Sequence, residues 1–238
     1  MVEGKQHKLY SQYLCLLGKL FLDHKTLCFD VDPFQFFILT ENNSRYNTKN
    51  IVGYFCREKS MNEDINLACI MVLPPYQRRG YGKFMICFSY FMSGQIDNRM
   101  CTPERPLSNM GALSYMSFWK DKIFDSLRTN KQFRKAHFDV SIREIGEYAN
   151  IQLDDILLTL QSQDMIKYWK GTYLVKNVSQ RFLDTYFRQK KRKEEQLIKD
   201  GVGLQLKFDP KYVIKAKMSL MKASKPKEVG AKKQREAQ

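Results

Sequence analysis

The chain has 238 residues, a hydrophobic fraction of 43% and a formal net charge of +15 at pH 7. The apolar content, which includes 16 Phe and 13 Tyr, is enough for a packed core and excludes a globally disordered chain. The length indicates one large domain, or a domain with a small appendage, and the positive charge favours acidic partners such as phosphates or nucleic acid.

The six cysteines are widely separated, and no two of them form a Cys-x-x-Cys pair. This spacing argues against a zinc cluster or a disulfide scaffold, so we expect no bound metal and a reducing compartment. The sequence also shows no signal peptide and no apolar run of membrane-spanning length, which predicts a soluble intracellular protein. The cysteines are Cys15, Cys28, Cys56, Cys69, Cys87 and Cys101.

The first part of the chain is predicted to form a helix and then three strands. Apolar residues at helical spacing over 8–22 predict an amphipathic helix whose leucines face the core. Residues 34–41 and 51–57 are aromatic and β-branched, so we expect two strands joined by a long polar hairpin loop over 42–50. With 65–73 these stretches predict consecutive antiparallel strands.

A basic loop follows the third strand. Two prolines end that strand, because proline cannot donate to a ladder, and the apolar run 84–92 predicts a buried helix. Between them lies Gln77-Arg78-Arg79-Gly80-Tyr81-Gly82-Lys83. Its glycines allow close backbone approach, its basic side chains add charge, and the helix dipole favours an anion. The alternative is an ordinary basic loop, whereas Rossmann and Walker A sites lack support because neither a third glycine nor Gly-Lys-Ser/Thr is present.

The next stretches predict a loop over 94–103 and a helix from Ser108 to about 127. From 139 the composition changes, and a capping-box pattern, two short helices and a hairpin over 165–175 follow. Helix, turn, helix and hairpin form a winged-helix pattern. Because the second helix begins with acidic residues, we do not expect this region to read DNA.

Two basic stretches end the sequence. Residues 188–199 predict a charged helical face, and the Lys-rich residues 222–238, with Pro and Gly, predict disorder. Such clusters serve nuclear import or non-specific contact with nucleic acid, and simple solvation of the charges is the alternative.

Several motifs resemble, in order and spacing, the MYST family of histone acetyltransferases. The basic loop is similar to the pyrophosphate loop of acetyl-coenzyme-A-dependent N-acetyltransferases, and residues 167–171 are most similar to the males-absent-on-the-first subgroup. The resemblance covers roughly residues 4–175. Relatives carry a zinc finger and opening strands ahead of the first helix, and this sequence is expected to lack them because Met1 almost adjoins that helix. The motifs are 20–27, 53–55 with 58–59, 66–70, 73–83 and 102–108.

The resemblance implies lysine acetylation. Free lysine has a pKa of about 10.4, so only about one in a thousand is deprotonated at neutral pH and a general base is needed. Glu104 occupies the family's position for this base, and a carboxylate paired with Arg105 is the alternative. Cys69 matches a cysteine proposed to carry the acetyl group transiently, whereas direct attack by lysine would leave Cys69 as a packing residue.

The resemblance also implies a site for acetyl-coenzyme A. Backbone N–H groups around Ile70 and Val72 are expected to bind the thioester arm and its developing oxyanion. Ser108 and Ser117 match coenzyme-contacting serines, and Lys25 matches a lysine that the family carries acetylated. The pyrophosphate is expected on Arg78, Arg79, Gly80, Tyr81, Gly82 and Lys83.

The sequence departs from the family pattern at a few positions. Val72 stands where relatives usually have threonine, although a backbone contact survives that change. Asn109 replaces the usual aspartate after Ser108. None of these changes removes a residue with a direct chemical role.

We therefore predict an α+β fold with a GNAT-like acetyltransferase core of antiparallel strands and helices, followed by a winged-helix-like region. The acetyl-coenzyme-A-binding core is expected over 1–137, the winged-helix-like region over 138–180, and a charged helix with a basic, disordered tail over 181–238. The implied function is a nuclear histone lysine acetyltransferase that acts on histone tails within a multi-subunit chromatin complex. A catalytically inactive chromatin scaffold is the main alternative, and a small-molecule N-acetyltransferase is a third hypothesis.

Overall fold

The computed structural model describes residues 1–20, 30–43, 45–59, 64–94, 98–130, 133, 140–176 and 178–199. All of them belong to one compact unit, Met1–Leu206. The predicted acetylation site Lys25 and the basic stretch 222–238 lie outside the described residues.

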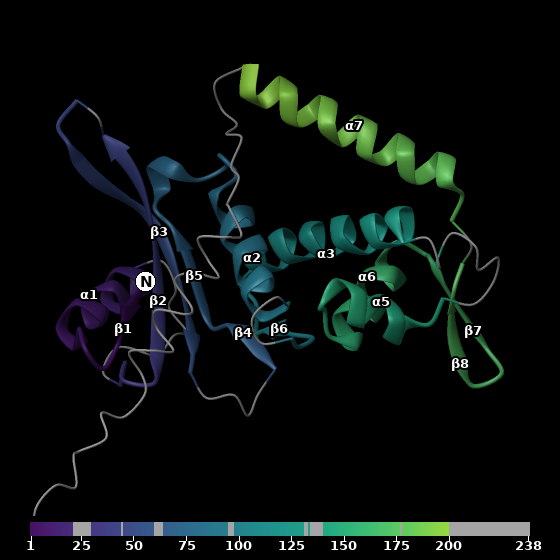
Figure 1. Cartoon of the computed structure of the whole chain (residues 1–238), viewed down its shortest axis with the longest axis horizontal. Helices are drawn as coiled ribbons and strands as arrows, with labels where there is room; N and C mark the ends of the chain where they lie inside the picture. The colour runs from purple at the N-terminus through teal and green to yellow at the C-terminus, as the bar shows by residue number, and fades with distance from the viewer. Residues whose placement is uncertain are drawn as a thin grey trace, which may run out of the picture. The chain divides into compact units, whose positions relative to one another are not determined.

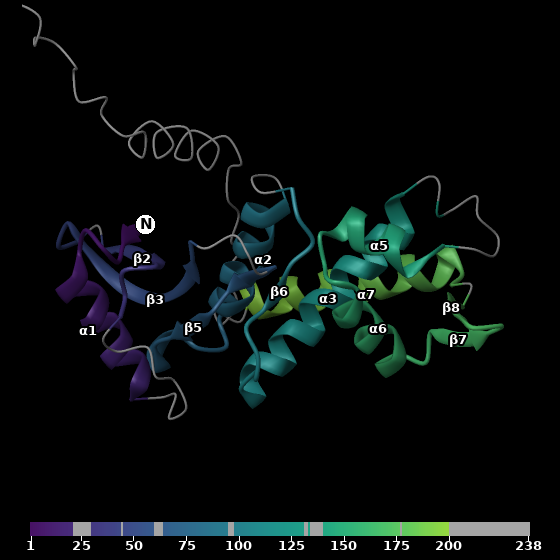
Figure 2. The same cartoon turned by 90° about the horizontal axis from the view of Figure 1, so that it is seen from below.

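An antiparallel sheet with the strand order β1-β2-β3-β5 forms the first part of this unit. Helix α1 (Lys8–Lys19) packs on one face of the sheet and helix α2 (Tyr81–Met92) on the other (Figures 1 and 2). The predicted mixture of antiparallel strands and helices is thus confirmed. The four strands are β1 (Val2–Glu3), β2 (Phe34–Asn43), β3 (Thr48–Glu58) and β5 (Cys69–Val72).

Alternating side chains on the strands build a separate core on each face of the sheet. Phe36 and Tyr54 pack beneath α1, whereas Phe37 and Phe55 stack on each other beneath α2 with ring centroids 4.7 Å apart. Phe88 of α2 meets both stacked rings edge-on. The period of two in the strands therefore decides which helix each aromatic residue contacts.

Helix α1 approaches the sheet through small and apolar residues and not through all of its leucines. Leu14 and Gly18 are buried, and Tyr54 donates from its hydroxyl to the Leu14 carbonyl over 2.7 Å. A methyl group on Gly18 would lie 2.5 Å from that hydroxyl, so the helix sits close to the strand. Leu9 and Leu16 are 61% and 47% exposed, and the prediction that the leucines of this helix face the core is wrong for them.

The predicted long loop over 42–50 is largely a continuation of the hairpin. Strand β2 runs to Asn43 and β3 begins at Thr48, and these two residues are paired. The prediction failed because the end of this ladder is held by backbone hydrogen bonds, which need no apolar side chains. Its polar residues indicated a loop, but most of them belong to strands β2 and β3.

The predicted single strand over 65–73 is two strands that belong to different sheets. Strand β4 (Ile65–Leu67) pairs in parallel with β6 (Thr102–Pro103), whereas β5 pairs with β3. Strand β6 lies within the predicted loop 94–103, which is a second correction. Both errors arise because a change of strand partner leaves no mark on hydrophobic periodicity.

Helix α3 (Asn109–Thr129) is the centre of the second part of the unit. It lies between helix α7 (Gln180–Lys199) on one side and helices α5 (Ile142–Ala149) and α6 (Leu153–Ser162) on the other (Figure 1). The predicted helix from Ser108 is thus confirmed, and it has Ser108 as its N-cap.

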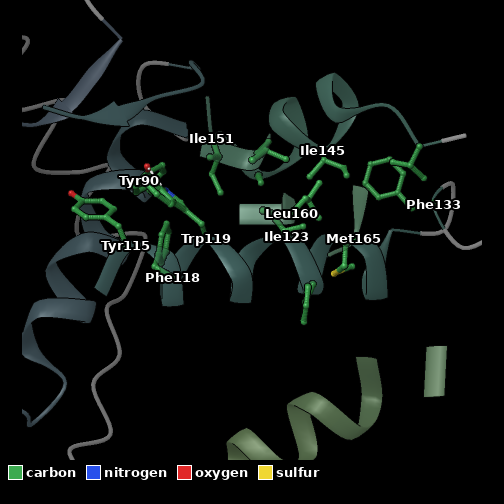
Figure 3. Packing of buried hydrophobic residues seen from close by; sticks show 14 of the residues in the cluster. Tyr90, Tyr115, Phe118, Trp119, Ile123, Phe133, Ile145, Ile151, Leu160 and Met165 are labelled. Atoms are coloured by element: carbon green, nitrogen blue, oxygen red, sulfur yellow. Dashed lines mark hydrogen bonds between the residues drawn. The ribbon is translucent and has the colours of Figure 1, made fainter. Parts of the chain in front are cut away.

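The core around α3 combines residues from all of these helices. Trp119 and Ile123 of α3 are fully buried against Ile145 of α5 and Leu160 of α6 (Figure 3). The indole N–H of Trp119 donates to the Tyr90 hydroxyl of α2 over 2.8 Å. Since one cluster contains residues from α2, α3, α5 and α6, the helices before and after residue 138 share a core.

The helices α5 and α6 and the hairpin that follows them form as predicted. The capping box is present, because Ser141 accepts from the Glu144 N–H and Glu144 accepts from the Ser141 N–H. Asn150, with φ of 58°, turns the chain into α6. Strands β7 (Ile166–Trp169) and β8 (Thr172–Val175) then pair as an antiparallel hairpin.

Candidate active site

Several candidate residues lie near the junction between β4 and β5. Ala68 separates the two strands, and its N–H donates to the Cys56 carbonyl over 2.8 Å. Beyond it, β5 is the last strand in the order of its sheet, so its outer edge pairs with no other strand in the described part of the chain. The backbone of Ile70 and Val72 therefore lies at the sheet edge where an extended group can bind.

Glu104 follows β6 directly and is held to the neighbouring strand. Its N–H donates to the Leu67 carbonyl at the end of β4 over 2.9 Å, and Cys69, the first residue of β5, lies two positions further along the chain. The structure therefore brings the two predicted catalytic residues to adjacent backbones. The side chain of Glu104 is half-buried.

Arg105 is the residue with which Glu104 would pair in its alternative role. The Arg105 guanidinium forms an ion pair with Asp155, a residue of α6 that is 1% exposed. Burial raises the pKa of the Asp155 carboxyl above its ordinary value, although hydrogen bonds and the nearby Arg105 oppose this shift. The loop after Glu104 is thus tied to the C-terminal helices.

The side chains of Cys69 and Ile70 point to opposite faces of the sheet. Cys69 is 7% exposed and belongs to the apolar cluster beneath α1, together with Tyr54 and Met71. Ile70 and Val72 pack toward α2. The side chain of Cys69 therefore has apolar packing partners. The same strand, β5, carries both Cys69 and the backbone predicted to bind the thioester arm.

The basic loop enters α2 through two residues with left-handed backbone conformations. Arg78 has φ of 61° and Gly80, the N-cap of α2, has φ of 94°. A methyl group on Gly80 would meet no atom within 4 Å, so the space beside the helix start is open. Phe84 donates the first helical bond to the Gly80 carbonyl, and no side chain caps the N–H groups that precede it. This uncapped helix start suits an anion.

Two side chains of the loop point toward the protein. Tyr81 is buried, and its hydroxyl donates to Glu41. Burial, followed by the Glu41 hydrogen bond, raises the pKa of Tyr81 to about 12. Lys83 forms an ion pair with Asp121 of α3, with 2.6 Å between Nζ and Oδ2. Burial lowers the pKa of Lys83, but the Asp121 bond outweighs it and the pKa is raised.

The two predicted serines lie at different places on α3. Ser108 is exposed at the N-cap and accepts from the Gly111 N–H over 3.1 Å. Ser117 is exposed one turn before Asp121, so it shares the helix face that meets Lys83. Ser117 is therefore on the face of α3 whose Asp121 pairs with Lys83, while Ser108 lies closer in sequence to Glu104.

Several residues of this region have roles that sequence reasoning missed. Glu41, Asp121 and Asp155 anchor Tyr81, Lys83 and Arg105, each from an element distant in sequence. The sequence gives no signal for these contacts, because the spacing of residues indicates only which side chains are neighbours within one helix or strand.

The described residues show no metal or membrane feature. Among them, no group of three or more His, Cys, Asp or Glu side chains is placed to hold a metal ion. None of the described helices is both long and apolar enough to cross a membrane. None of the five cysteines that the structure describes forms a disulfide.

Comparison with known proteins identifies the family. The model of the MOZ/SAS family matches residues 1–202. The chain is 48% identical to "Histone acetyltransferase MOF" of Drosophila melanogaster over 174 residues, which make up 73% of the chain and 20% of that protein. It is 48% identical to "Histone acetyltransferase of the MYST family 1" of Arabidopsis thaliana and 45% identical to "Histone acetyltransferase Tip60 homolog" of Caenorhabditis elegans, covering 37% of each.

The chain thus spans between a fifth and about two fifths of the length of these relatives. The family model nevertheless matches most of its residues, including every described candidate residue above, which confirms the resemblance seen in the sequence. This chain belongs to the MOZ/SAS (MYST) family.

Proposed function

We propose that the chain is the catalytic part of an acetyl-coenzyme-A-dependent histone lysine acetyltransferase. The observation that carries this proposal is the Glu104–Leu67 hydrogen bond of 2.9 Å, which holds Glu104, whose side chain is half-buried, beside the segment that leads into the edge strand β5. The names of the three relatives, each a histone acetyltransferase, support the substrate class.

The basic loop fits the diphosphate of a coenzyme. The open space beside Gly80 allows a phosphate to approach the backbone, and the uncapped N–H groups of Tyr81, Gly82 and Lys83 provide donors. Arg78 and Arg79 add positive charge, and Ser117 offers a hydroxyl one turn from Asp121. The backbone of Ile70 and Val72 is assigned to the thioester arm, which supplies the activated acetyl group.

Glu104 is assigned the role of general base. It takes one proton from the ammonium of the substrate lysine, so that the neutral amine attacks the thioester carbonyl. The new C–N bond forms, the C–S bond breaks, and the second amine proton passes to the leaving thiolate. Glu104 then releases its proton to solvent. N–H groups of β5 that point outward stabilise the charge that develops on the carbonyl oxygen.

We assign Cys69 a packing role within this mechanism. Its side chain lies in the apolar cluster beneath α1, while the backbone of the residues that follow it in β5 forms the strand edge. Direct transfer from the thioester to lysine needs no acetyl-cysteine, because Glu104 removes the proton that prevents the lysine nitrogen from attacking.

The C-terminal helices and hairpin are proposed to be a winged-helix-like wall that supports this site. The N–H of Gln152, at the start of α6, donates to the Cys101 carbonyl over 3.1 Å, and Cys101 donates to Asn150 over 3.1 Å. These bonds clamp the strand that leads to Glu104. The division into parts at 1–137, 138–180 and 181–238 is proposed on the same basis, as a division of roles within one compact unit.

The proposed cellular setting follows from the substrate. A histone acetyltransferase works on chromatin, so we infer that the chain acts in the nucleus, on histone tails and as part of a multi-subunit complex. The net charge of +15 supports contact with nucleic acid, for which the Lys-rich stretch 222–238 is the predicted segment.

Substrate competition tests the proposed function. The purified full chain is incubated with labelled acetyl-coenzyme A and either histone-tail peptides or small amines such as polyamines. We expect label on peptide lysines. Label on small amines alone would support a small-molecule N-acetyltransferase, and coenzyme binding without any transfer would support a chromatin scaffold.

A further inference from the structure

The Asp121 carboxylate joins the start of α2 to helix α7. Its Oδ2 lies 2.6 Å from Lys83 Nζ and also 2.6 Å from Lys190 Nζ of α7. Its Oδ1 accepts from the Tyr186 hydroxyl over 2.8 Å. Burial opposes ionisation of Asp121, yet the hydrogen bonds of Lys190 and Lys83 hold its pKa below the ordinary value. Two ammonium groups therefore share one charged carboxylate.

This sharing leaves positive charge beside the first turn of α2. Lys83 and Lys190 carry two charges and Asp121 carries one, so one positive charge is uncompensated within the triad. Glu194 lies 3.9 Å from Lys190 and is more than half exposed, so solvent screens its effect. Lys120, over the Tyr186 ring, adds further positive charge nearby.

We propose that Lys190 is a positioning residue of the coenzyme site, acting through Asp121 on Lys83. This inference rests on the proposed function. By holding the same carboxylate oxygen, Lys190 weakens the hold of Asp121 on Lys83 and leaves the Lys83 charge available to the coenzyme phosphates. Helix α7, although distant in sequence from the basic loop, thereby sets coenzyme affinity.

Two variants with the same change of charge separate this role from a general effect. Lys190→Gln removes the shared ammonium, so Asp121 neutralises Lys83 alone. Lys191→Gln removes an equal charge from the next residue of α7, where the side chain is 79% exposed and lies near Glu195. Affinity for acetyl-coenzyme A, measured by calorimetry on the full chain at low salt, is expected to fall about threefold to tenfold in Lys190→Gln and to stay near wild type in Lys191→Gln.

The double variant Asp121→Asn/Lys190→Gln provides the decisive comparison. Removing the carboxylate releases Lys83, and Asn can still accept from Tyr186, so we expect affinity to return toward the wild-type value. If Lys190 only anchored α7, adding Asp121→Asn to Lys190→Gln would weaken coenzyme binding below that of Lys190→Gln alone. That result would overturn the proposal. Thermal melts confirm that each variant is folded.

The remaining outcomes are also decisive. Equal affinity of Lys190→Gln, Lys191→Gln and wild type would show that Lys190 does not act on the coenzyme site, while the proposed function would stand. A wild-type chain that binds no acetyl-coenzyme A would contradict the proposed function itself and, with it, the role of Lys190.

Discussion

The backbone N–H of Glu104 donates to the carbonyl oxygen of Leu67 over 2.9 Å. This bond extends the pairing of β6 with β4 by one residue, up to the point where Ala68 turns the chain toward β3. It therefore fixes the backbone of Glu104 beside the segment that leads into β5, whose outer edge pairs with no other strand in the described part of the chain. The relationship depends on backbone atoms, so side-chain changes at Glu104 should leave it intact.

The backbone conformation of the basic loop leads to a binding prediction. Gly80→Asp adds a negative charge at the helix start, where φ is 94°, and should weaken acetyl-coenzyme A binding by about tenfold or more because the helix start then repels phosphate. Gly171→Asp is the matched control, since Gly171 has φ of 86° and equally open surroundings at the β7–β8 hairpin. Calorimetry should show near-normal affinity for this control. Equal loss in both variants would indicate a general effect of backbone strain.

The packing of Cys69 predicts modest effects of its removal. Cys69→Ala should lower kcat by less than about tenfold and cost about 1 kcal/mol of unfolding free energy, because it removes one buried sulfur atom. Cys56→Ala is the control, because Cys56 is the register partner on β3 and lies in the same cluster. The two variants should behave alike in turnover assays and urea titrations. An acetyl-Cys69 adduct that forms and decays at the turnover rate would refute the packing role.

The ion pair between Arg105 and Asp155 predicts an asymmetry in stability. Arg105→Gln leaves the buried Asp155 carboxyl without its cation and should lower the free energy of unfolding by about 1–3 kcal/mol. Asp155→Asn removes the buried charge and leaves only a half-exposed arginine, so its effect should be smaller. Arg143→Gln, on the surface of α5, should change stability by less than about 0.5 kcal/mol. Urea denaturation checks this order, and a larger loss in Asp155→Asn would contradict it.

The lowered pKa of Asp121 predicts how stability depends on pH. A carboxyl with a lowered folded-state pKa contributes stability above its ordinary pKa, and this contribution is lost as pH falls through the lowered value. Asp121→Asn should therefore be less stable than wild type by about 1–3 kcal/mol at neutral pH, and the difference should shrink below about pH 4. Urea midpoints at pH 7 and pH 3 measure both values.

Asp125→Asn is the control for this pH dependence, because Asp125 is on the same helix and pairs with Arg128 at the surface. Its difference from wild type should be below about 1 kcal/mol at neutral pH. A difference for Asp121→Asn that does not change between the two pH values would show that its charge contributes nothing.

The parts of the fold that the sequence predicted are those set by local pattern. Alternating aromatics such as Phe36 and Phe37 indicate a strand with two buried faces, and Ser141 with Glu144 indicates a helix start, whatever lies elsewhere in the chain. The change of partner at Ala68 was missed, because it depends on β6, whose residues lie far along the chain and show no strand pattern.

The candidate site was predicted in its composition but not in its contacts. Resemblance to the family pointed to Glu104, Cys69 and the basic loop, and the structure places the first two on adjacent backbones. The pairing of Asp121 with both Lys83 and Lys190 was not foreseen, because it joins three helices. Similarly, the spacing of Leu9 and Leu16 indicated a buried face, but Gly18 and Tyr54 decide which side of α1 meets the sheet.

The central claim is that Glu104 accepts the proton of a histone lysine while acetyl passes from coenzyme A to that lysine. The most direct test measures label transfer from acetyl-coenzyme A to a histone-tail peptide by wild type, Glu104→Gln and Glu147→Gln, a surface control on α5, across a range of pH. Wild type and Glu147→Gln should transfer acetyl to lysine, whereas Glu104→Gln should keep coenzyme affinity, lose about 10²–10⁴-fold in kcat at neutral pH and recover in part at high pH as the substrate amine deprotonates. A near-normal rate for Glu104→Gln at neutral pH would contradict the account.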